Sequence, residues 1–363
     1  MKSFKYFLIA LLLFSYSANA QNNFAKIDSW LANNVKTLGG RTYLLIYKDG
    51  KIIYSRGENE LNVRQKMMNK VIARKQGKTA DLEDYTADTR VQIASCSKWL
   101  SAALVMTFVD EGKLKLTDTI GKYLPVLAAS GKGKITIAEC LAHLTAIQSP
   151  ELKASLAALK TFKNMDDAIK NIAAMPMEGA HGKVFHYSNV GLQLAGSVIE
   201  KVSGQSFEQL FQDRIAKPLE MVNTSFGKSP VVLPAGGATS SAADYMNFQI
   251  MILTKGVYKG KRILSENSIR QMQINRITND VKVAYSPAEA GDIGYGFGEW
   301  VPKNSTLSNP STYVSSPGLF GSYPLVNNQK QYAAFLMTYY IKGEGRQQRY
   351  AELKALIDGA VSP

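Results

Sequence analysis

The sequence predicts an α+β fold in which an antiparallel sheet is built from both ends of the chain and a helical region is inserted between them. Strand-like patterns lie at about residues 40–60 and 290–345, whereas helical periodicity dominates about residues 95–255. Strands at the two ends with helices in between are typical of a sheet with discontinuous halves. The 363 residues, 45% of them hydrophobic, are enough for a sizeable core in one large unit or two domains.

The first twenty residues have the pattern of a secretory signal peptide. Two lysines precede an apolar run over residues 7–14, and an Ala-Asn-Ala sequence ends at Ala20. The apolar run is too short for a stable membrane span, and no later segment is long and apolar enough to form one. We therefore expect a signal peptide over residues 1–20, a mature domain over 21–363 with no stable membrane anchor, and a periplasmic or secreted location.

The mature chain is predicted to open with a β-hairpin. Residues 41–47 and 51–55 are rich in Tyr, Ile and Leu, and Asp49-Gly50 lies between them. An Asp-Gly pair supplies the two positive φ angles that a tight hairpin turn requires.

The formal net charge is +14, and one cluster stands out within the segment of residues 61–88. Its cations lie in a stretch that looks helical and polar on most faces: Arg64, Lys66, Lys70, Arg74, Lys75 and Lys78. The export signal and the lack of interleaved aromatic residues argue against a nucleic-acid partner. The alternatives are a solvated face, a surface attracted to an anionic envelope, and a lid or docking surface beside a cleft.

A nucleophile motif follows that segment, where an extended stretch (residues 89–94) runs into a helix. Ser95-Cys96-Ser97-Lys98 places Ser95 and Lys98 three residues apart, and residues three apart share a helix face. The amine then lies beside the hydroxyl, and the first-turn amides favour negative charge there. Helical periodicity continues to Phe108, and Gly112 supplies a stop. The motif predicts an activated serine and acyl-transfer chemistry.

Further helices and strands complete the pattern. Helical periodicity is found over residues 137–144, 165–174, 189–203, 207–215 and 241–253, with a closing helix over 347–358. Strand patterns return over residues 295–301, 321–326 and 332–340. The predicted sheet therefore needs strands that are far apart in the chain.

A second candidate motif is Tyr187-Ser188-Asn189, at a turn that enters a helix. In that position the phenol of Tyr187 can project into a cleft. Another Tyr-x-Asn, at Tyr245, lies within an amphipathic helix, where a packing role is expected.

Metal and thiol chemistry have little support in the sequence. Cys96 and Cys140 are predicted to be buried free thiols. The three histidines, His143, His181 and His186, lack zinc-ligand spacing and are expected to be structural. No metal and no cofactor is expected.

Ser95-x-x-Lys98 together with Tyr187-Ser188-Asn189 resembles the serine β-lactamase and penicillin-binding protein superfamily. The nearest branches are class C β-lactamases, D-alanyl-D-alanine peptidases and related esterases. Residues 135–145, 236–245 and 295–300 are similar to further family segments in the same order. The resemblance implies a β-lactamase/transpeptidase-like fold over most of the mature chain.

The third family motif differs in this chain. The family places Lys-Thr-Gly or His-x-Gly on a strand beside the site, and the corresponding stretch here begins Ser316-Pro317-Gly318-Leu319. The glycine is kept, but a neutral Ser316 stands where the family has a cation that can attract a substrate carboxylate. By resemblance, Asn189, Ser316, Gly318 and Leu319 bind substrate, and the amides of Ser95 and Leu319 form the oxyanion hole.

The resemblance also implies roles for the polar groups. Ser95 is the nucleophile, Lys98 accepts its proton, and Tyr187 shuttles a proton to the leaving group and activates the deacylating water. Asn189 orients either the substrate or Lys98. Whether Lys98 or Tyr187 is the base stays open at this point, because both have ordinary pKa values near 10 and one must be lowered.

Three functions are compatible with these residues. The first is an exported serine hydrolase that cleaves a small ester or amide, most simply an esterase. The second is a β-lactamase or D-Ala-D-Ala carboxypeptidase acting on a β-lactam or a peptidoglycan-derived substrate. The third is a non-catalytic protein that uses this fold to bind cell-wall fragments or a partner. Substrate trials separate the first two, and ligand binding that survives loss of Ser95 identifies the third.

Overall fold

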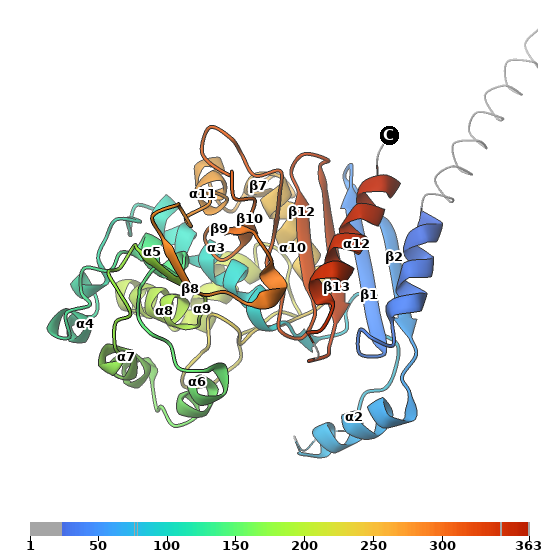
Figure 1. The fold of residues 1–363 in the computed structure, drawn as a ribbon, viewed down its shortest axis with the longest axis horizontal. Coiled ribbons are helices and arrows are strands. Elements are labelled where there is room, and N and C mark those ends of the chain that lie inside the picture. Colours follow the sequence, from blue (N-terminus) through green and yellow to red (C-terminus); the bar gives the residue numbers. More distant parts are fainter. Residues whose placement is uncertain (1–23, 76, 78, 342, 362–363) are drawn as a thin grey trace, which may run out of the picture.

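The computed structural model describes residues 24–75, 77, 79–341 and 343–361, and the predicted signal peptide lies outside them. Figure 1 shows a sheet flanked by helices on one side of the molecule and a larger, mostly helical part on the other. In the described part of the chain, no helix is both long and apolar enough to cross a bilayer.

The central sheet confirms the predicted α+β fold. Its seven antiparallel strands have the order β2-β1-β13-β12-β11-β10-β9. They are β1 (Arg41–Lys48), β2 (Lys51–Asn59), β9 (Gly294–Tyr295), β10 (Trp300–Val301), β11 (Tyr313–Ser315), β12 (Tyr323–Asn327) and β13 (Tyr332–Thr338). The N-terminal hairpin joins the C-terminal strands through β1 and β13, where Leu44 faces Leu336. The sheet is therefore made of the two ends of the chain, as predicted.

The predicted hairpin turn is confirmed. Asp49 and Gly50 have φ angles of 49° and 81°, the positive values that a tight turn between twisted strands needs. Strand β2 continues to Asn59, beyond the predicted end.

Helices and short strands fill the chain between the two halves of the sheet. The helices are α2 (Val63–Lys75), α3 (Ser97–Asp110), α4 (Pro125–Ala129), α5 (Ile137–Leu141), α6 (Leu152–Leu159), α7 (Met165–Ala174), α8 (Val190–Ser203), α9 (Phe207–Phe211), α10 (Ala242–Leu253), α11 (Glu266–Met272) and the closing α12 (Arg346–Ala360). The short strands are β3 (Val91–Gln92), β4 (Val184–His186), β5 (Thr239–Ser240), β6 (Val257–Tyr258), β7 (Lys261–Arg262) and β8 (Lys282–Tyr285). Helix α5 ends earlier than predicted because His143 has a φ of 58°.

Two hydrophobic cores hold the sheet between layers of helices. A helix over residues 24–34 packs with α12 on one face, where Leu31 and Ile357 meet strand residues such as Leu44. Helix α10 packs on the other face, against β1, β12 and β13, and α3 belongs to the same large core, where Trp99 contacts Phe248 of α10. The nucleophile helix α3 is therefore buried, with twelve of its residues inaccessible, from Ser97 to Phe108.

The stretch 295–301 is not the single strand that its apolar pattern predicts. Strands β9 and β10 pair with each other, with Trp300 opposite Tyr295, and residues 296–299 form the turn between them. Gly298 has a φ of 76°. A side chain at Gly298 would lie 2.5 Å from the backbone oxygen of Lys98. The turn therefore packs directly against α3.

Replacing Gly298 with alanine is expected to destabilise the protein by about 3 kcal/mol. The left-handed backbone costs about 1 kcal/mol for alanine, and the clash with α3 adds about 2 kcal/mol of overpacking. The control is Gly359→Ala in α12, where a Cβ meets nothing within 4 Å, and a gain of about 0.5 kcal/mol is expected. Urea unfolding of both variants measures the difference, and equal midpoints would contradict the close approach.

Candidate active site

Ser95 lies in a turn that leads into α3. A 3-10 turn over Ala94–Cys96 connects β3 to the helix. Ala94 has a φ of 45°, a left-handed value that alanine rarely adopts. Strain of this kind persists only when surrounding contacts hold it. The strained turn presents the Ser95 hydroxyl to a cavity instead of burying it in the helix.

Lys98 lies one turn after Ser95, in the first turn of α3. Its Nζ donates to the Ser95 Oγ at 3.1 Å and to the carbonyl oxygen of Ala235 at 2.8 Å. The amine also lies 4.7 Å from the centre of the Tyr187 ring. The structure therefore brings Tyr187 together with Ser95 and Lys98 from a distant segment of the chain.

Burial changes the acid–base behaviour of Lys98. The side chain is 1% exposed, and this loss of solvation lowers the pKa of Lys98 from 10.5 to about 7. Glu299, a buried carboxyl on the turn that packs against α3, does not offset the effect, since burial raises the pKa of Glu299 well above its usual value and favours the neutral acid. A substantial fraction of Lys98 is therefore neutral at pH 7 and able to accept a proton.

Tyr187 lies just after β4, and aromatic rings hold it in place. It stacks on Trp300, with ring centres 5.2 Å apart and an interplanar angle of 26°. Burial raises the pKa of Tyr187 above its usual value of 10, and the hydrogen bond with Ser95 lowers it only in part. The phenol is therefore protonated at neutral pH.

His143 is a structural partner of Tyr187. Its ring is 4.7 Å from the Tyr187 ring, and its Nε2 is 3.2 Å from the Tyr295 hydroxyl. The backbone N–H of Ser188 donates to Nδ1 at 3.5 Å, so Nε2 carries the proton and donates to Tyr295. Burial, the largest cause, lowers the pKa of His143 well below 6.5. The predicted structural role is consistent with this neutral imidazole, which fixes the backbone on which Tyr187 sits.

Asn189 lies at the start of α8 and lines the same cavity as Ser95. Its side chain does not cap the helix. The contacts of the Lys98 amine are with Ser95 and Ala235, not with Asn189. Of the two roles expected for Asn189, contact with a substrate is the one that this position favours.

The stretch after β11 was expected to bind substrate, and one of its residues, Ser316, lies elsewhere. Gly318 and Leu319 line the cavity, but Ser316 does not. The Ser316 hydroxyl donates to the carbonyl oxygens of Gly298, at 2.9 Å, and Ser95, at 3.3 Å, and the residue is 1% exposed. Ser316 therefore ties the nucleophile turn to the 296–299 turn instead of facing a substrate.

Gly318 allows the chain to approach the nucleophile turn. A Cβ at this position would lie 2.3 Å from the Ile93 carbonyl oxygen and 3.2 Å from the Cys96 sulfur. This contact brings the backbone of Leu319 to the same cavity wall as Ser95. The two backbone N–H groups that the resemblance assigns to an oxyanion hole, those of Ser95 and Leu319, therefore belong to residues that line one cavity.

The cavity above Ser95 has a volume of about 840 Å³. Its apolar walls come from both sides of the molecule and include Leu152, Leu156, Leu233, Trp300, Leu319 and Phe320. Polar side chains that line it include Glu178 and His186, whose Oε1 and Nδ1 are 2.7 Å apart, and Arg346. The space suits an organic molecule with a sizeable apolar group.

Cys96 and Cys140 are buried and unpaired, as predicted. Burial raises the pKa of both thiols above their usual value, which keeps them protonated and unreactive. Within the residues that the structure describes, no group of three metal-ligating side chains is close enough to hold a metal ion.

Three contributors to the site were not assigned from sequence. They are the Ala235 carbonyl that accepts from Lys98, the Trp300 ring under Tyr187, and His143. Ala235 directly precedes the Gly-Gly segment that resembles the family, and the other two lie within stretches that do so. The resemblance of these stretches to the family was the only sequence signal for the three residues, and it does not show which side chains they contact.

Comparison with known proteins agrees with the geometry. Protein flp of Staphylococcus aureus (strain MW2) is 28% identical over 186 residues, which are 50% of this chain and 34% of flp. The chain thus spans about a third of the length of that relative.

Solved structures share the fold. A candidate beta-lactamase from Bacteroides dorei DSM 17855 superposes with a TM-score of 0.76 at 23% identity, over 93% of this chain and 98% of that one. EstCE1, a hydrolase with promiscuous acyltransferase activity, gives a TM-score of 0.69 at 18% identity, over 93% and 100% of the two chains. The Beta-lactamase family model matches residues 31–358. The chain therefore belongs to the Beta-lactamase family, a family of serine hydrolases.

Proposed function

We propose that this protein is an exported serine hydrolase that cleaves a small ester or amide through an acyl-enzyme on Ser95, with an esterase-like preference. The observation that carries the proposal is the contact of a desolvated Lys98 amine with the Ser95 hydroxyl at the floor of a large apolar cavity. Serine is a weak nucleophile until a base takes its proton, and this arrangement supplies the base.

Lys98 is the proton acceptor in this proposal, and Tyr187 is the donor to the leaving group. Burial shifts the two pKa values in opposite directions, downward for Lys98 and upward for Tyr187. At neutral pH the lysine is then the group that can accept, and the phenol is the group that can give a proton. The opposed shifts support separate acid and base roles.

An esterase-like preference is supported by the stretch of residues 316–319, which has no cation. Ser316 supplies no cation there, and its hydroxyl is occupied by backbone carbonyls. Binding of a neutral ester or amide does not need a cation at this position. A substrate with a carboxylate would lose the ion pair that such a cation provides. A family VIII carboxylesterase shares the fold of this chain.

One observation favours β-lactams or D-Ala-D-Ala peptides as a second candidate. Arg346, in the first turn of α12, lines the cavity beside Phe320. A guanidinium there can attract a substrate carboxylate from a different element than the family motif uses. Hydrolysis of a cephalosporin or a D-Ala-D-Ala peptide at a rate above that of simple esters would replace the esterase proposal with this one.

The decisive experiment is the intact mass of the purified protein after treatment with a fluorophosphonate. The wild type is expected to gain one adduct, and Ser95→Ala is expected to gain none. The matched control is Ser97→Ala, which removes a buried hydroxyl two residues away that accepts from the Ala238 N–H. An unlabelled wild type would favour a non-catalytic binding protein, and ligand binding that survives Ser95→Ala would establish it.

The rate of adduct formation is expected to rise with pH through about 7 and then level off. Lys98 must be neutral to accept the Ser95 proton, and its pKa is lowered to about 7 by burial. Below pH 7 each unit of acidification removes about tenfold of the neutral form. Labelling rates between pH 5 and pH 9 measure this profile, and a flat profile would contradict Lys98 as the base.

A further inference from the structure

Helix α2 differs from the other long helices because it has no buried residue. It lies between β2 and the segment that leads to the nucleophile. Figure 1 shows it projecting away from the sheet and from the helical part. A helix of thirteen residues is marginally stable in water unless one face packs against something. Its stability therefore calls for a partner outside the chain, or for strong local support.

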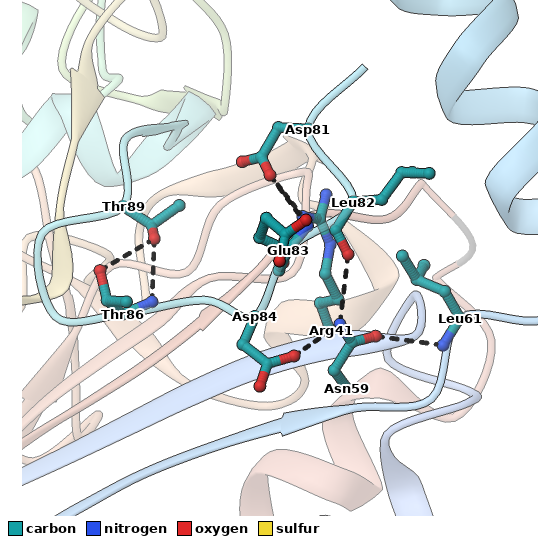
Figure 2. Close-up of polar contacts among 9 residues, drawn as sticks. All are labelled: Arg41, Asn59, Leu61, Asp81, Leu82, Glu83, Asp84, Thr86 and Thr89. Atoms are coloured by element: carbon teal, nitrogen blue, oxygen red, sulfur yellow. Dashed lines mark hydrogen bonds and ion pairs between the residues drawn. The ribbon is translucent and has the colours of Figure 1, made fainter.

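The two ends of the projecting segment are fastened to the sheet (Figure 2). The Asn59 side chain donates to the Asp84 carboxylate at 2.7 Å and to the Leu82 carbonyl at 3.3 Å. Arg41 donates to the Glu83 carbonyl at 2.8 Å. These bonds close the base of the segment, so the helix is carried on a fixed attachment.

The start of the helix is also capped. The backbone N–H of Gln65 donates to the Asn62 side chain, and the Gln65 side chain accepts from the Asn62 N–H, both at 2.9 Å. Reciprocal bonds of this kind satisfy the first free amides of a helix. The first turn is also tied to the chain before β1, because the Gln65 side chain donates to the Lys36 carbonyl at 3.3 Å. The helix is thus started locally, while none of its residues is buried.

The surface of α2 is strongly cationic. It contains no acidic residue, and its five cations are all exposed: Arg64, Lys66, Lys70, Arg74 and Lys75. Within the described residues, no carboxylate forms an ion pair with any of these five. Elsewhere on the surface exposed lysines pair with carboxylates, as Lys217 does with Asp213. The charge of α2 is therefore available to an anionic surface.

The same helix exposes large apolar side chains. Five of them have a third or more of their surface in solvent: Val63 at 75%, Met67 at 63%, Met68 and Val71 at 55%, and Ile72 at 40%. Single exposed apolar residues are common, but five in one helix form a patch that usually has a partner. Exposed cations beside exposed Met, Val and Ile side chains offer an anionic bilayer both an electrostatic and an apolar contact.

We propose that α2 docks the protein on the surface of an anionic lipid bilayer. The cations attract the acidic headgroups, and the apolar side chains enter the boundary between headgroups and acyl chains. A second copy of this helix is a poor occupant because it would bring five like charges against five. A lid over the cavity is not supported either, because none of the described residues between 61 and 88 lines the cavity.

The test is flotation of the purified protein with lipid vesicles. The wild type is expected to bind vesicles of mixed phosphatidylglycerol and phosphatidylcholine at about 0.05 M salt. It is not expected to bind vesicles of phosphatidylcholine alone. The triple variant Lys66→Gln, Lys70→Gln, Lys75→Gln is expected to bind at least about tenfold more weakly, because each lysine contributes to the attraction. The triple variant Met67→Gln, Met68→Gln, Ile72→Gln is expected to bind at low salt but to be released by about 0.5 M salt before the wild type is.

The matched control removes the same charge from exposed lysines elsewhere, with Lys51→Gln, Lys160→Gln and Lys261→Gln. It is expected to bind almost as well as the wild type. Equal losses in the two lysine variants would show a non-specific effect of net charge and overturn the proposal. Failure of the wild type to bind vesicles that contain phosphatidylglycerol would also overturn the proposal. Self-association of the protein through α2, in place of lipid binding, would do the same. Fluorophosphonate labelling without lipid should be the same in all variants, because none of the changed residues touches Ser95.

Discussion

Replacement of Lys98 by methionine is expected to slow acylation of Ser95 by about 10³-fold. Methionine keeps the length and packing of the side chain but cannot accept the Ser95 proton or donate to the Ala235 carbonyl. Both fluorophosphonate labelling and ester hydrolysis should fall together, since both begin with attack by Ser95. Intact-mass kinetics and initial rates measure the two effects.

The same variant is expected to be more stable than the wild type at neutral pH. The unfolded chain holds the Lys98 proton up to a pH of about 10.5, whereas burial lowers the pKa of the folded lysine to about 7. Between these values the unfolded state binds more protons, so native stability rises with pH. Below pH 7, burial of the charged Lys98 amine destabilises the wild type by about 5 kcal/mol. Loss of the two hydrogen bonds of this amine destabilises the variant by about 2 kcal/mol, which offsets part of that gain.

The expected net gain for Lys98→Met is therefore about 3 kcal/mol at or below pH 7, and it should disappear as the pH approaches 10. Urea unfolding at several pH values measures this trend. The control is Lys132→Met, at a second buried lysine whose amine donates to the Ala173 carbonyl at 2.8 Å, away from the cavity. It should leave labelling intact. A Lys98 variant that is less stable at every pH would contradict the burial cost assigned here.

Replacement of Tyr187 by phenylalanine is expected to lower hydrolysis of alkyl esters by about 10²-fold to 10⁴-fold. Phenylalanine keeps the stacking on Trp300 and the contact with His143 and removes only the hydroxyl. An alkoxide is a poor leaving group without a proton, so its departure depends on Tyr187 in the proposed mechanism.

The dependence on the leaving group distinguishes proton donation from a structural role. A p-nitrophenyl ester needs little help to lose its alcohol, so the effect of Tyr187→Phe should shrink by at least about tenfold with it. Tyr245→Phe is the control, because its hydroxyl donates to the Cys96 carbonyl at 2.8 Å behind the nucleophile turn. This variant should affect both esters equally. An equal effect of Tyr187→Phe on both esters would contradict the donor role.

The sequence predicted those parts of the fold that depend on local chemistry. Asp49-Gly50 defines a hairpin through its positive φ angles, and Met165–Ala174 was predicted with the bounds that the structure shows. Strand patterns at both ends of the chain predicted one shared sheet, and the structure shows it in the pairing of β1 with β13. In the site, the spacing of Ser95 and Lys98 was sufficient to place the amine beside the hydroxyl.

Features that depend on distant contacts were missed. The stretch 295–301 reads as one strand, because its apolar pattern does not show that Gly298 turns against α3. Ser316 reads as a substrate contact, because nothing local indicates that its hydroxyl faces two carbonyls. The left-handed Ala94 has no local signal either, since alanine prefers other conformations.

The position of β1 beside β13 also has a consequence for how the molecule folds. Strand β1 is synthesised early and can pair with β2 at once. It can pair with β13 only when residues near the C-terminus have been synthesised. Contacts between the two ends of a chain form slowly, because a long loop must close first. Until then one edge of the hairpin is free to pair with another chain. Refolding at high concentration should therefore lose protein to aggregation, and a nascent chain truncated before Tyr332 should have an incomplete sheet.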